Sequence, residues 1–62
     1  MKIGDYAFVD YATGESFHGE VVQVRTMPGD RVLFTLKIEG VGFRAMYVDK
    51  CISLDYSSGI EA

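Results

Sequence analysis

A chain of 62 residues carries 48% hydrophobic and 24% charged side chains, with a formal net charge of −3. Its length allows a single hydrophobic core, so we expect one domain at residues 1–56 and a polar tail at residues 57–62. The composition excludes a disordered chain, and no apolar run approaches the ~20 residues of a membrane span. The net charge argues against a general nucleic-acid binder. We expect a soluble, cytoplasmic protein without membrane contact.

The chain has one cysteine, Cys51, and one histidine, His18. Neither an intrachain disulfide nor a Cys/His metal site can be assembled from them, so we expect no metal and no cofactor. A small domain without these supports commonly gains stability by association, which predicts a homo-oligomer or a protein partner. A Cys51–His18 pair is conceivable in space, but no complete catalytic set is evident. We assign no catalytic residue, and whether the chain is an enzyme stays open.

Apolar residues recur with a period of two between glycine-bearing turns, which predicts strands rather than helices. We expect strands at residues 6–11, 20–26, 31–38, 43–48 and 52–54, an ordered loop at 12–19 and a 3₁₀ turn at 49–51. Pro28, Gly29 and Asp30 suit a tight turn. Five short strands in so short a chain predict an all-β fold, a five-stranded barrel with one 3₁₀ turn before the last strand.

The alternation within these strands predicts which side chains form the core. Two valines of the second strand, Val22 and Val24, are expected to face inward. In the third strand the expected inward positions are Val32, Phe34, Leu36 and Ile38. Because the chain has no tryptophan, phenylalanines and tyrosines must fill the interior. We expect Phe8, Phe34 and Phe43 there, and leave open whether Tyr11 and Tyr47 belong to the core or to a binding surface.

Two segments resemble SH3 domains. Residues 7–11, Ala-Phe-Val-Asp-Tyr, resemble the family's Ala-Leu-Tyr-Asp-Tyr opening, and residues 42–48 resemble its Gly-aromatic-x-Pro-x-Asn-Tyr-Val strand. The resemblance implies an SH3-like barrel, with Tyr11 and Tyr47 in the position of the proline-peptide groove. Val9 and Ala45 stand where that groove has a tyrosine and a proline.

Two further resemblances imply other functions. Residues 4–5 and 19–24 are similar to the glycine and valine cadence of KOW-type domains, which implies nucleic-acid binding. The cations available for phosphate contacts are Arg25, Arg31, Lys37 and Arg44. The same cadence is similar to plasmid-borne type II dihydrofolate reductase, a tetramer of SH3-like barrels around a pore. Residues 44–47 would take the place of its pore strand, which implies an oligomeric pore enzyme.

Two surfaces are candidates for binding. The first is an aromatic region near the first loop, made of Tyr11, Phe17 and Tyr47. The second is the outward face of the middle strands, which mixes cations with apolar side chains. Its members are Arg25, Leu33, Arg44 and Met46. Our leading hypothesis is a small non-catalytic interaction module that binds a protein partner or itself; the alternatives are a KOW-like nucleic-acid binder and a pore enzyme.

Overall fold

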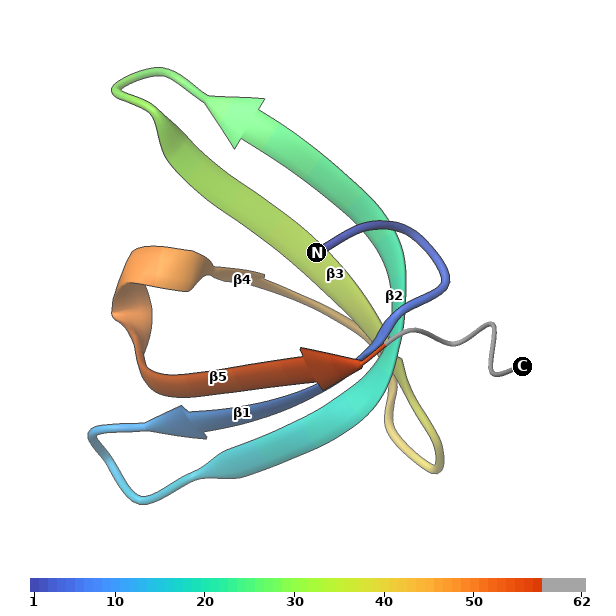
Figure 1. Cartoon of the computed structure of the whole chain (residues 1–62). Coiled ribbons are helices and arrows are strands. Elements are labelled where there is room, and N and C mark those ends of the chain that lie inside the picture. Colours follow the sequence, from blue (N-terminus) through green and yellow to red (C-terminus); the bar gives the residue numbers. More distant parts are fainter. Residues whose placement is uncertain (58–62) are drawn as a thin grey trace.

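A computed structural model of the chain describes residues 1–57, so the polar tail expected at residues 57–62 lies outside the described residues except for Ser57, the last residue of β5. The elements are β1 (Tyr6–Tyr11), β2 (Ser16–Met27), β3 (Arg31–Ile38), β4 (Gly42–Tyr47), the 3₁₀ turn η1 (Val48–Lys50) and β5 (Cys51–Ser57) (Figure 1). The expected all-β class, five strands and 3₁₀ turn before the last strand are confirmed. Within residues 1–57 no helix is long and apolar enough to cross a membrane.

The five strands form one antiparallel sheet in the order β4-β3-β2-β1-β5. The sheet is not closed into the expected barrel, because β4 and β5 form its two edges and do not pair with each other. The short turn η1 carries the chain from one edge to the other (Figure 1). Each edge strand therefore keeps one row of backbone N–H and C=O groups without a strand partner.

The long strand β2 joins the two halves of the sheet. Its residues 16–20 pair with β1 and its residues 20–27 pair with β3, and the strand curves between them (Figure 1). Gly19 lies at this bend, where a Cβ atom would overlap the carbonyl group of Lys37. The loop expected at 12–19 is shorter than predicted, because residues 16–19 pair with β1.

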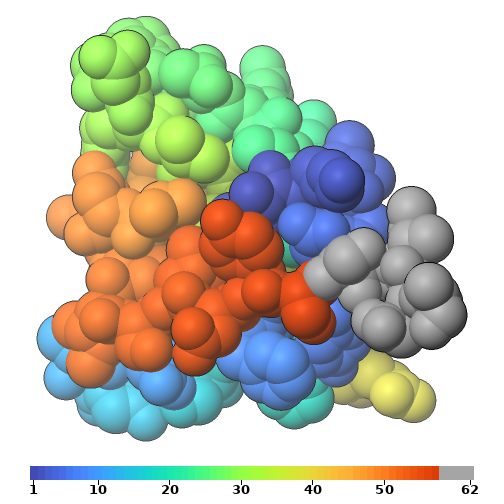
Figure 2. Space-filling model, in the orientation of Figure 1, coloured from blue at the N-terminus to red at the C-terminus, as the bar shows by residue number. Residues whose placement is uncertain are grey.

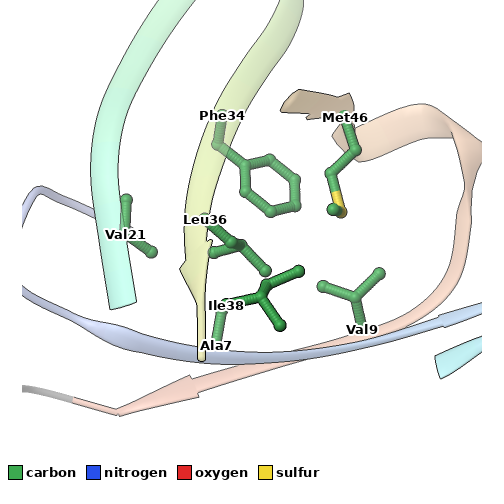
Figure 3. Packing of buried hydrophobic residues seen from close by; sticks show 7 residues of the cluster. All are labelled: Ala7, Val9, Val21, Phe34, Leu36, Ile38 and Met46. Atoms are coloured by element: carbon green, nitrogen blue, oxygen red, sulfur yellow. The ribbon is translucent and has the colours of Figure 1, made fainter. Parts of the chain in front are cut away.

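Seven apolar side chains from β1, β2, β3 and β4 are buried and form the core (Figure 3). They are Ala7, Val9, Val21, Phe34, Leu36, Ile38 and Met46. Three of the four inward positions predicted for β3 are among them, and Val32 is half-buried. The expectation for Val22 is wrong: the pairing register shifts between Val21 and Gln23, and such a bulge reverses the alternation. Val21 is buried instead, while Val24 packs against the core as expected.

Two of the three phenylalanines expected in the core lie outside it. Phe34 is fully buried, whereas Phe8 is 52% and Phe43 is 70% exposed. Because paired residues share a face and neighbours along a strand alternate, buried Ala7 and Val9 place Phe8 on the opposite face. Phe43 is likewise on the outer face, opposite Lys37.

A turn at the N-terminus covers one end of the core. The backbone N–H of Lys2 donates to the buried Asp5 carboxylate at 3.0 Å. Two backbone hydrogen bonds tie the turn to β2: the N–H of Gly4 donates to the carbonyl oxygen of Val21, and the N–H of Val21 donates to that of Asp5. Figure 2 shows the N-terminal segment beside β5, below the β2–β3 hairpin. An apolar hollow opens where these parts meet. Its lining residues are Met1, Val24, Thr26, Val32, Val48, Leu54 and Tyr56.

Candidate interaction surface

Three rings gather on the outer face of β1 and β2, and we call Tyr6, Phe8 and His18 the outer aromatic patch. The ring centroids of Tyr6 and Phe8 lie 5.3 Å apart, and the rings of Phe8 and His18 are stacked at 5.7 Å with an interplanar angle of 27°. Tyr6 is 38% and Phe8 52% exposed. These separations are within the range of favourable ring contacts, so the patch is one continuous aromatic surface open to solvent.

Strand pairing fixes the patch. Phe8 is the cross-strand partner of His18, and Tyr6 lies two residues before Phe8 on the same face of β1. A hydrogen bond of 2.9 Å joins the Tyr6 hydroxyl to Nδ1 of His18. The rings are therefore held by the sheet and by one another, and a ligand would meet a surface that is largely ordered in advance.

Carboxylates surround the patch. Asp55 is the strand partner of Phe8, and Glu20 is the strand partner of Tyr6. Asp10, on the same face as Phe8, accepts a 2.6 Å hydrogen bond from Ser16. A shallow hollow beside Tyr6 is lined in addition by Glu20, Lys37 and Glu39. Four carboxylates against one lysine give the neighbourhood of the patch a negative formal charge.

The structure unites two of the three residues of the predicted aromatic region. Tyr11 and Phe17 meet edge to face at 5.7 Å and pack against the core, and the guanidinium of Arg44 lies 4.6 Å above the Phe17 ring. Burial is the main cause that raises the pKa of Tyr11 above its ordinary value, with Cys51 adding to it. Tyr47 is on the other face of the sheet, opposite Leu33, and does not join them.

The predicted sheet face is also divided. Arg25 and Leu33 are strand partners on the outer face, as expected. Met46 does not share that face, because it pairs with Phe34 and is only 3% exposed. Arg44 pairs with buried Leu36 and turns toward Phe17. The alternation of β4 is the reverse of the one assumed from the sequence, and its outward positions hold Phe43, Ala45 and Tyr47.

Arg31 makes the one ion pair found among residues 1–57. Its Nε donates to Oδ2 of Asp49 at 2.9 Å and Nη2 to Oδ1 at 3.3 Å, while its guanidinium lies 3.8 Å from the centre of the Tyr47 ring. The hydrogen bond from Arg31 holds the pKa of Asp49 below its usual range and raises the pKa of Arg31. Tyr47 is thus already covered by an arginine of its own chain.

Cys51 and His18 are not brought together. The Cys51 thiol donates to the carbonyl oxygen of Tyr47 at 3.4 Å, and burial, followed by the charge of Asp49, raises its pKa, so the thiol stays protonated at neutral pH. His18 lies on the outer face against Tyr6 and Phe8. In the described part of the chain no three His, Cys, Asp or Glu side chains are grouped so as to hold a metal ion.

The outer aromatic patch was not predicted from the sequence. Tyr6 and Phe8 alternate with Ala7 and Val9, so the pattern located two faces of β1 but did not say which one was buried. The available signal was Gly19, because only small side chains fit where β2 bends over the end of β3. Comparisons of the chain with protein-family models, with curated proteins and with solved structures gave no match.

Proposed function

We propose that the chain is a small, non-catalytic interaction module that binds another protein through the outer aromatic patch. The observation that carries this proposal is the contact of three rings, Tyr6, Phe8 and His18, on a face that the fold leaves open to solvent. Aromatic side chains are enriched in protein interfaces and dominate their binding energy. We further propose that the five-stranded sheet is SH3-like, which the 3₁₀ turn η1 before the last strand supports.

The charges around the patch favour a protein over a nucleic acid. Aromatic rings also stack on bases, but such sites combine them with a positively charged groove. Here the strand partners of Phe8 and Tyr6 are Asp55 and Glu20. Two of the four cations expected to contact phosphate are engaged elsewhere, Arg31 with Asp49 and Arg44 on Phe17. Binding to a protein is therefore the function we propose, and a cytoplasmic location and self-association stay predictions.

Selection from a displayed library of random peptides tests the proposal. We expect the immobilised protein to enrich peptides that bind with micromolar affinity, and we expect Phe8→Ser to weaken that binding at least about ten-fold. Phe43→Ser is the matched control, because Phe43 is a more exposed phenylalanine of the same face and lies on β4. It should leave the affinity within about two-fold of the wild type.

Circular dichroism and urea unfolding of both variants establish that they fold. Binding that survives Phe8→Ser, or that Phe43→Ser reduces equally, would remove the outer aromatic patch as the contact surface. Sedimentation of the free protein gives the second result. A dimer that Phe8→Ser converts to monomer would show that the partner is a second copy of the chain, which is the self-assembling form of the same module.

A further inference from the structure

We infer that the outer aromatic patch recognises an arginine side chain of its partner, with the guanidinium lying on the Phe8 or Tyr6 ring and paired with the neighbouring carboxylates. This inference rests on the proposed function and names the chemistry of the ligand. Three features of the described residues support it: two arginines already cover other rings of this sheet, the rings of the patch have carboxylates as strand partners, and the formal charge around the patch is negative.

The chain itself shows how its rings accept arginine. The Arg31 guanidinium lies 3.8 Å from the centre of the Tyr47 ring and holds both carboxylate oxygens of Asp49. On the inner side, Arg44 lies 4.6 Å above Phe17. Both contacts place a planar cation over a ring face, which is the geometry of a favourable cation–π interaction. In the first of them, a carboxylate beside the ring completes the site.

The outer aromatic patch has the same parts without an arginine. Phe8 has Asp55 as its strand partner, and Tyr6 has Glu20. Within residues 1–57 neither carboxylate takes part in an ion pair, and the two arginine contacts with rings are those of Arg31 and Arg44. The hollow beside Tyr6, lined by Glu20, Glu39 and Lys37, adds space next to the rings.

The chemistry of arginine fits these surroundings better than that of an apolar side chain. Its guanidinium stacks on a ring while its N–H groups point outward in the plane of the guanidinium, where they reach carboxylate oxygens. A purely apolar ligand would cover the rings but would desolvate Asp55 and Glu20 without pairing them. The negative surroundings also attract a basic segment before contact is made, and salt weakens this attraction.

The test uses a blocked peptide, Gly-Leu-Arg-Leu-Arg-Gly, and the same peptide with citrulline in place of arginine, titrated into the isotopically labelled protein. Citrulline keeps the planar shape and loses the charge. We expect the arginine peptide to shift the NMR signals of Tyr6, Phe8 and His18, and to bind about ten-fold more tightly than the citrulline peptide at low salt. The double variant Glu20→Gln, Asp55→Asn should reduce this preference to about two-fold.

Asp30→Asn is the matched control, because it removes one charge at the β2–β3 turn and leaves Glu20 and Asp55 in place. It should keep the preference. Equal binding of the two peptides, or an arginine preference that the double variant retains, would overturn the inference. Peptides from the library that depend on Phe8 but carry no arginine would overturn it while the proposed function stands. A library that yields no peptide dependent on Phe8 removes the proposed function itself.

Discussion

The two faces of the sheet carry the same residue types but differ in how far these side chains are buried. Phe34 on the inner face is fully buried, with Leu36 and Met46 beside it, whereas Phe8 on the outer face is 52% exposed and packs against the rings of Tyr6 and His18. Burial from water is what converts apolar area into folding free energy. The inner face therefore stabilises the fold, whereas the outer face leaves apolar area exposed to solvent.

Replacing one phenylalanine on each face tests this difference most strongly. We expect Phe34→Ala to cost about 3–5 kcal/mol, because it removes a fully buried ring and leaves a cavity. A domain of this size has a stability of only about 3–5 kcal/mol, so the variant should be largely unfolded by circular dichroism at 25 °C. Phe8→Ala should cost less than about 1 kcal/mol in urea unfolding. Similar losses for the two variants would contradict the assignment of the faces.

The bend of β2 gives a second test of the difference between the two faces. Gly19→Ala adds a Cβ atom that overlaps the carbonyl group of Lys37 on the inner side, and backbone on both sides leaves little room to relax. We expect a loss of about 1–3 kcal/mol in urea unfolding. Glu20→Ala, one position along on the outer face, should change stability by less than about 0.5 kcal/mol. A stable Gly19→Ala variant would show that the bend does not depend on glycine.

Much of the fold followed from the sequence because each strand carried a local signal. Strands β1 and β3 were predicted at their observed bounds, since turn residues lie at their ends and the alternation within 31–38 is unbroken. β2 and β5 are longer than predicted, because strand pairing overrides the polar and glycine residues found within 16–19 and 55–57. The expected closure into a barrel rested only on the small size of the chain and the need to protect strand edges. Local sequence patterns do not decide whether the edge strands pair.

The candidate surface was harder to predict because it depends on which face is buried. The bulge after Val21 reverses the phase of β2 without any mark in the composition, and the pairing of Met46 with Phe34 is visible only once β4 is in register. β1 is apolar on both faces, so the exposed position of Phe8 follows from its partner strands and not from its own neighbours.

The smallest expected effect concerns Arg31, which covers the Tyr47 ring on the outer face. Its hydrogen bond lowers the pKa of Asp49, so the pair stabilises the fold above the ordinary aspartate pKa of about 4, and this contribution is lost as the pH falls through the folded pKa. Asp49→Asn and Arg31→Gln should each flatten the acid side of the stability profile, measured by urea unfolding between pH 2 and pH 6. Asp30→Asn leaves both partners in place and should retain more of the slope. If Arg31→Gln leaves the wild-type slope unchanged, the ion pair contributes nothing to stability in solution. The contact of Arg31 with Tyr47 would then no longer support the inference that an arginine of a partner binds on Phe8.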